Sequence, residues 1–180
     1  FLQDGSNRRT DAYGGSIENR GRLLLEVVDA AVGVWGRERV GVRLSPYGTF
    51  NDMHDSDPVA LFTHVLGRLS DRGIAYVHMI EPRATSAGGG DAILEAAPCT
   101  SEIFRPLFDG VFISAGGYDR EGALEAVASG RADAIAFGRA FIANPDLPER
   151  LRQDAPLNPY DRSTFYGGDA TGYTDYPALG

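Results

Sequence analysis

The feature that most constrains the fold is a repeated alternation of short apolar runs with longer amphipathic segments. Apolar runs short enough for strands stand at residues 40–44, 75–80, 111–114 and 134–137. Helical spacing marks residues 17–35, 58–72 and 120–129, and a further helix is expected around Ile103 and Phe104. Strands that alternate with helices pair in parallel through right-handed crossovers. The pattern therefore predicts an α/β fold.

Local signals mark where two of these helices begin and end. Ser16 can cap the first helix, and Gly36 follows its last apolar residue. Asp57 and Pro58 open the second helix, and Gly73 ends it. These positions predict helix boundaries to within a residue or two.

Two segments lack periodicity. Residues 84–98 are rich in Gly and Ala, which predicts a mobile loop leading into the helix around Ile103. From residue 154 onward the chain is rich in Pro, Gly, Asp and Tyr, which predicts a tail that wraps a surface.

Two α/β architectures fit this pattern, a small open sheet or part of an eight-stranded barrel. A complete barrel takes about 250 residues, and only four strands fit in this chain of 180. An open nucleotide-binding sheet predicts a G-x-G-x-x-G turn after its first strand, and none follows residues 40–44. Glycines follow the last two strands instead, where barrels bind phosphate. We therefore expect one domain over residues 1–180, formed as the later half of a (β/α)8 TIM barrel.

Composition excludes several classes of function. The formal net charge is −8 and the pI about 4.8, which argue against nucleic acid or an anionic membrane as the main partner. All 17 basic residues are Arg, so Schiff-base lysine chemistry is excluded. The single Cys99 excludes a CxxC motif and suits a reducing, cytoplasmic compartment. His54, His64 and His78 are too scattered to predict a metal site, and no membrane span or leader is expected.

Arg43 and two pairs of residues are the candidate binding groups. Arg43 stands near the carboxyl end of an apolar strand, where it needs either an Asp or Glu on a neighbouring strand or a ligand that gains negative charge. The pairs Gly116-Gly117 and Gly138-Arg139 each follow a strand and precede a helix. Each glycine alone can be a simple turn, but two such turns after successive strands, one of them with an Arg, favour a phosphate cradle.

Other polar and aromatic residues leave alternatives open. Glu81 and Arg83 flank Pro82 at a strand end, where an ion pair is expected in preference to a cleft-lining role. The tail aromatics, among them Phe165 and Tyr166, either pack on a barrel rim or form the stacking wall of a flat ligand.

Ordered sequence blocks resemble those of a known family. Residues 7–20 read NRRTDAYGGSIENR, which resembles the N-x-R-T-D-x-Y-G-G-S-x-E-N-R signature of the old yellow enzyme family of FMN-dependent ene-reductases. The blocks VRLSP, HMIEPR, AGGY, FGR, ANPDL, DRSTFY and GYTDYP follow in the same order. The resemblance covers essentially the whole chain and is close to the branch of oxophytodienoate reductases and bacterial alkene reductases.

The resemblance implies a barrel that binds FMN, is reduced by NADPH, and passes hydride to the β-carbon of an enone. It implies that Arg43 lies near the pyrimidine side of the flavin. Gly116, Gly117, Gly138 and Arg139 match the phosphate-binding turns. Phe165 and Tyr166 match tail aromatics near the dimethylbenzene edge of the flavin.

The family's substrate-binding and proton-donating residues lie on a His-x-x-Asn-x-Tyr-type motif upstream of the block that begins at Phe1. We therefore expect no catalytic residue within residues 1–180, an inactive isolated chain, and the N-terminal half of the same barrel as its partner. An alternative is a non-catalytic half-barrel that binds a phosphate compound or flavin and needs a partner half. A different phosphate-binding barrel enzyme, such as an isomerase or aldolase, fits the ordered tail blocks less well.

Overall fold

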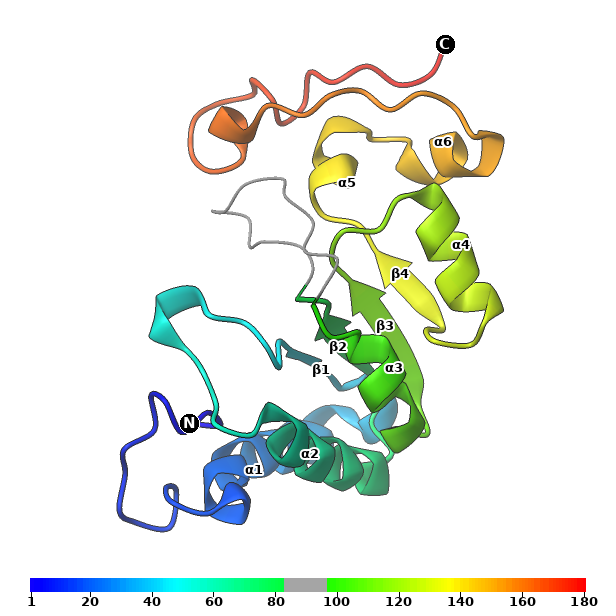
Figure 1. The fold of residues 1–180 in the computed structure, drawn as a ribbon. Coiled ribbons are helices and arrows are strands. Elements are labelled where there is room, and N and C mark those ends of the chain that lie inside the picture. Colours follow the sequence, from blue (N-terminus) through cyan, green and yellow to red (C-terminus); the bar gives the residue numbers. More distant parts are fainter. Residues whose placement is uncertain (83–96) are drawn as a thin grey trace.

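A single parallel sheet organises the chain. The computed structural model describes residues 1–82 and 97–180 (Figure 1). Its strands lie in the order of the sequence, β1-β2-β3-β4, and pair in parallel throughout. They are β1 (Gly41–Leu44), β2 (Tyr76–Ile80), β3 (Val111–Ala115) and β4 (Ala134–Ala136). The predicted α/β fold is confirmed.

Helices connect the strands and cover one face of the sheet (Figure 1). The α-helices are α1 (Ile17–Trp35), α2 (Pro58–Arg72), α3 (Thr100–Phe104), α4 (Arg120–Ala128), α5 (Arg139–Ala143) and α6 (Leu147–Gln153). Short 3-10 turns are η1 (Arg37–Arg39), η2 (Phe50–Asp52), η3 (Arg105–Leu107) and η4 (Arg162–Thr164).

The predicted helix caps are confirmed. The Ser16 hydroxyl accepts a hydrogen bond from the Asn19 amide at 3.3 Å, and the Asp57 carboxylate accepts one from the Ala60 amide at 3.0 Å. Gly73 ends α2 in the left-handed conformation, with φ +59°. These bonds satisfy amides that have no acceptor within their own helix.

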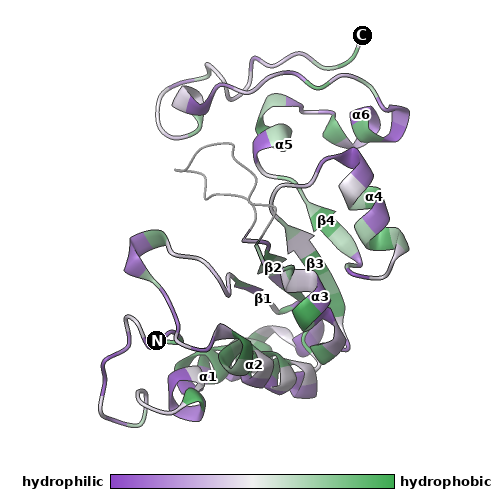
Figure 2. Ribbon diagram, viewed as in Figure 1, coloured by the Kyte–Doolittle hydropathy of each residue, from purple (hydrophilic) through white to green (hydrophobic). Residues whose placement is uncertain are grey.

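The core lies between the sheet and the helices. Strand residues alternate between two faces, and the face toward the helices is buried, with Val42, Val77 and Phe112 contributed by successive strands. Leu61, Val65 and Leu69 of α2 are fully buried in the same cluster. Hydrophobic residues accordingly follow the strands in Figure 2.

The opposite face of the sheet is open. Tyr76 and Val111 on this face are 39% and 46% exposed, and Arg43 is exposed beside them. We expected residues 40–44 to be buried as a strand, and that expectation is wrong for Arg43. In a closed barrel this face is the interior, covered by the other strands. The four β/α units therefore form half of a (β/α)8 barrel.

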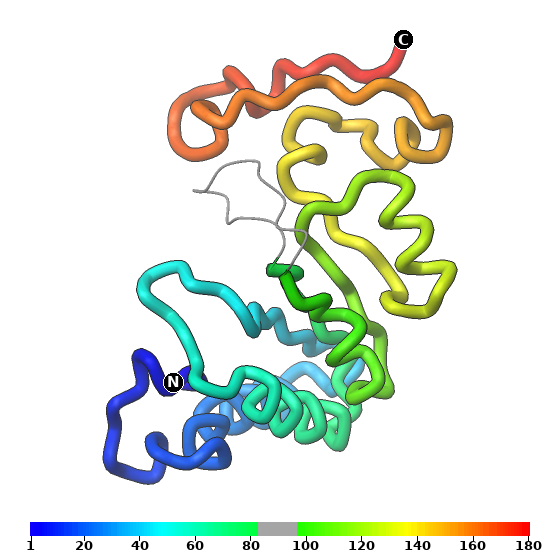
Figure 3. The backbone as a smooth tube through the Cα atoms, viewed as in Figure 1, coloured from blue at the N-terminus to red at the C-terminus, as the bar shows by residue number. Residues whose placement is uncertain are grey.

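The tail wraps a surface, as predicted. It runs alongside α5 and α6 in Figure 3 and contains one 3-10 turn, η4. Buried Arg150 donates to the carbonyls of Pro156 (2.5 Å) and Pro177 (2.9 Å), which fastens both ends of the tail to α6. Most of the predicted loop at residues 84–98, with Arg83, lies outside the described residues. Among the described helices, none is both long and apolar enough to cross a bilayer.

Candidate functional site

The carboxyl ends of β3 and β4 place the two predicted glycine turns side by side. Ala115 pairs with Ala136 in the sheet register; Gly116 follows Ala115 directly, and Gly138 follows Ala136 after one residue. Gly116 and Gly117 have φ values of +117° and +67°, which favour glycine over any other residue. The structure thus brings Gly116-Gly117 and Gly138-Arg139 to one edge of the sheet.

Gly138 differs from the other glycines of the site. Its φ is −94°, outside the left-handed region that favours glycine, and a Cβ there would meet no atom of the described residues within 4 Å. The packing of the described residues therefore does not require glycine at this position. The open space at the Cβ position fits the close approach of a ligand group, and the residues present suit a phosphate.

Arg139 is joined to the tail through an aromatic ring. Its guanidinium carbon lies 6.0 Å from the ring centroid of Tyr160, and that ring lies 5.4 Å from the ring of Phe165. The structure therefore places Arg139 and Phe165 in one cluster. Tyr166 is 75% exposed and lies outside the ring contacts of this cluster.

Arg43 lies on the open face of the sheet, paired in register with His78 of β2. Its register neighbour is an imidazole, so an ion pair with a carboxylate at that position is excluded. Burial lowers the pKa of His78, and the Arg43 charge lowers it further. Arg43 and the glycine turns stand on different strands, because β2 lies between β1 and β3. Two strand spacings are about 10 Å, a distance that a flavin nucleotide can span.

Glu81 is a residue whose role the sequence analysis missed. It is 2% exposed, and its carboxylate accepts hydrogen bonds from the amides of Thr100 (2.7 Å) and Ser101 (3.0 Å). The Ser114 hydroxyl donates to the same carboxylate at 3.1 Å. The ion pair expected at Glu81 and Arg83, with each other or with another loop, stays a prediction, because Arg83 lies outside the described residues. The observed contacts show that Glu81 holds the start of α3 and the end of β3.

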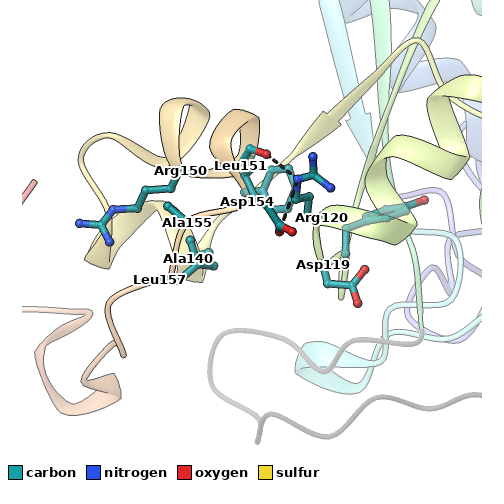
Figure 4. Close-up of a pocket in the computed structure, with 10 residues that line it drawn as sticks. Asp119, Arg120, Ala140, Arg150, Leu151, Asp154, Ala155 and Leu157 are labelled. Atoms are coloured by element: carbon teal, nitrogen blue, oxygen red, sulfur yellow. Dashed lines mark hydrogen bonds and ion pairs between the residues drawn. The ribbon is translucent and has the colours of Figure 1, made fainter. Parts of the chain in front are cut away.

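A pocket of about 220 Å³ lies between the loop after β3, α5 and α6 (Figure 4). Arg120 and Arg150 both reach its lining. Arg120 donates to the Leu151 carbonyl at 2.6 Å and lies 3.6 Å from the Asp154 carboxylate. Arg150 is engaged by the tail carbonyls described above. Oxygen atoms of the protein therefore already bind both arginine side chains of this pocket. We interpret the pocket as a packing feature and not as an anion site.

The described residues contain no group of three or more His, Cys, Asp or Glu side chains that could hold a metal ion. Cys99 is half-buried, and its thiol lies 3.3 Å from the Ser101 hydroxyl.

Comparison with known proteins assigns the family. The model of the NADH:flavin oxidoreductase / NADH oxidase family matches residues 1–158. The chain belongs to this family, the old yellow enzymes. It is 52% identical to 12-oxophytodienoate reductase 1 of Oryza sativa subsp. japonica, over 99% of this chain and 47% of the relative. It is 50% identical to 12-oxophytodienoate reductase 2 of Arabidopsis thaliana, with the same coverage of 99% and 47%.

A solved old yellow enzyme structure agrees with these relatives. Morphinone reductase in complex with tetrahydroNAD superposes with a TM-score of 0.88 at 49% identity, over 99% of this chain and 46% of that one. The chain thus spans about half the length of the curated relatives it matches. FMN is the cofactor of the family and a nicotinamide nucleotide is its reductant. The expectations of FMN as cofactor and of a nicotinamide reductant are therefore confirmed for the family.

Proposed function

We propose that the full-length protein is an FMN-dependent reductase of activated C=C bonds in α,β-unsaturated carbonyl compounds, with NADPH as its reductant. The observation that carries the proposal is the pair of glycine turns on neighbouring strands, with open space at the Cβ position of Gly138 and Arg139 as the next residue of the chain. Membership of the old yellow enzyme family and the 12-oxophytodienoate reductase relatives support it. The single cysteine is in keeping with a cytoplasmic protein.

In this proposal each predicted site residue has a separate task. The amides of Gly116, Gly117 and Gly138 and the Arg139 guanidinium hold the phosphate. Bound FMN supplies the hydride chemistry. The exposed Arg43 guanidinium stabilises negative charge on the pyrimidine side of the ring system.

Two aromatic residues complete the set. Phe165 and Tyr166 cover the dimethylbenzene edge, which requires Tyr166 to leave solvent when the flavin binds, since it is 75% exposed. The proton donor and the substrate-binding pair come from the other half of the barrel.

The test is the oxidation of NADPH and NADH by the full-length protein saturated with FMN. With 2-cyclohexenone present and dioxygen, the other acceptor for reduced flavin, removed, we expect nicotinamide oxidation that requires both the enone and FMN, faster with NADPH. Cyclohexanone, which lacks the activated double bond, serves as the matched control. Failure of the enone to stimulate oxidation of either nucleotide would refute the proposal.

The open face of the sheet favours a second candidate function for residues 1–180 alone. Tyr76 and Val111 are exposed on this face, and within the described sheet β1 and β4 each pair on one side only. Exposed apolar surface and open strand edges promote association. In this alternative the chain is a non-catalytic flavin-binding half-barrel that needs a partner half. Sedimentation of residues 1–180 tests it, and a stable folded monomer would contradict it.

A further inference from the structure

The buried carboxylate of Glu81 stands at the centre of a hydrogen-bond network beside the first glycine turn. Three groups donate to it: the amides of Thr100 and Ser101 and the hydroxyl of Ser114. Glu81 is 2% exposed and Ser114 is fully buried, so water does not compete for these bonds. A buried carboxylate is costly unless such donors surround it.

The network continues across the glycine turn. Ser114 has one hydroxyl hydrogen, which it donates to Glu81, so its oxygen accepts from the Tyr118 hydroxyl at 3.0 Å. Ser114 precedes Gly116-Gly117 and Tyr118 follows it. The Ser114 to Tyr118 bond therefore closes the two ends of the turn against each other, and Glu81 fixes the Ser114 end.

The backbone of Glu81 also contacts this glycine turn. Its amide donates to the Ala115 carbonyl at 2.7 Å. Its carbonyl oxygen would lie 2.8 Å from a Cβ at residue 116, so the turn packs directly on Glu81. Backbone and side chain of one residue thus both contact the segment that carries the turn.

We infer that Glu81 is a positioning residue for phosphate binding, which acts through Ser114 and Tyr118 on the turn at Gly116-Gly117. The inference rests on the proposed function, because it takes this turn as part of the FMN phosphate site. The sequence gives no sign of it, since Glu81 lies 33 residues from Ser114 along the chain.

The experiment compares the affinities of the full-length protein for FMN and for riboflavin, which lacks the phosphate, by quenching of flavin fluorescence. Glu81→Gln keeps the side-chain size but turns one acceptor oxygen into a donor that faces another donor. We expect the Kd for FMN to rise about five- to tenfold and the Kd for riboflavin to change less than about twofold. Tyr118→Phe removes only the hydroxyl and should raise the Kd for FMN about threefold.

The matched control is Asp55→Asn. Asp55 is also a buried carboxylate, but among the described residues it pairs with Arg20 of α1 and accepts a hydrogen bond from the Asp4 amide at 2.9 Å, and not from residues of β3. This variant should leave the ratio of the two Kd values unchanged, because it acts on stability alone.

The outcomes separate the inference from the proposed function. A wild-type protein with no preference for FMN over riboflavin overturns the phosphate site and the inference with it. A wild-type preference that Glu81→Gln and Tyr118→Phe both leave intact overturns only the role of Glu81. If Glu81→Gln does not fold, the ratio measured for Tyr118→Phe decides.

Discussion

Arg43 of β1 and His78 of β2 are register partners on the open face of the half-barrel, so a guanidinium and an imidazole lie side by side. Burial is the larger cause of the lowered pKa of His78, and the Arg43 charge is the second. In an NMR titration of the folded protein, His78 should therefore titrate below its ordinary pKa of 6.5. Arg43→Ala should raise that pKa without restoring the ordinary value. A wild-type pKa at or above the ordinary value would contradict this assignment.

The lowered pKa of His78 also predicts how the stability of the protein changes with pH. The unfolded chain takes up a proton on His78 before the folded protein does, because the pKa is lower in the folded state. Neutral His78 therefore contributes fully to stability at pH values above its ordinary pKa of 6.5. This contribution is lost as the pH falls through the lower pKa that His78 has in the folded state. Denaturant unfolding over this pH range should show a steeper loss of stability in the wild type than in His78→Gln. Equal slopes would argue against it.

Arg43→Ala should lower the reduction potential of the bound flavin in the full-length protein, so that the flavin is harder to reduce. Loss of a charge-assisted contact of about 1.5–3 kcal/mol corresponds to a two-electron potential roughly 30–60 mV more negative. Spectroelectrochemistry measures the change. Arg39→Ala is the control, because it removes the same charge at the opposite end of β1. A potential that moves equally in both variants would show a general charge effect only.

Gly116 and Gly138 should respond differently to alanine. Gly116→Ala combines φ +117° with a contact of 2.8 Å to the Glu81 carbonyl, so the free energy of unfolding should fall by about 1–3 kcal/mol. Gly130, at φ +75° with no atom within 4 Å of its Cβ position, is the control for backbone strain alone and should lose less.

Gly138→Ala should spare the fold and impair the ligand site. The φ of Gly138 is negative and no atom of the described residues lies within 4 Å of its Cβ position, so stability should change by less than about 0.5 kcal/mol. The Kd for FMN should nevertheless rise at least about tenfold, because the methyl group would occupy the open space that the ligand is proposed to approach. Unchanged FMN affinity would place the phosphate elsewhere.

Arg139→Ala should raise the Kd for FMN roughly ten- to hundredfold, since a charge-assisted contact with phosphate contributes about 1.5–3 kcal/mol. Arg139→Lys should restore only part of the affinity, because lysine lacks the planar fork. Arg152→Ala, whose side chain is 71% exposed and pairs with Glu149, is the matched control and should bind FMN as the wild type does. Fluorescence titration checks all of them.

Features set by neighbouring residues could be predicted from the sequence. Ser16, Asp57 and Gly73 act within a few residues of their own helix ends, so their roles follow from the local pattern. The positions of the glycine turns follow equally from the strands they end, because parallel strands bring their carboxyl ends to one edge.

Features that depend on packing between distant segments could not be predicted. The bonds from Glu81 to α3 and to Ser114 exist only once the register of β2 and β3 is fixed. The contact of Arg139 with Tyr160 likewise depends on the path of an irregular tail. Arg43 is exposed because one face of its strand is open in this chain, which alternation alone does not reveal.

The helix-covered core is assembled from strands and helices of this chain, whereas the opposite face of the same strands exposes Tyr76 and Val111. Replacement of the facing half by that of a relative should therefore leave the packing between these helices and strands intact. The change would fall on the partner of the open face, so that two halves with different histories could share one core-forming unit.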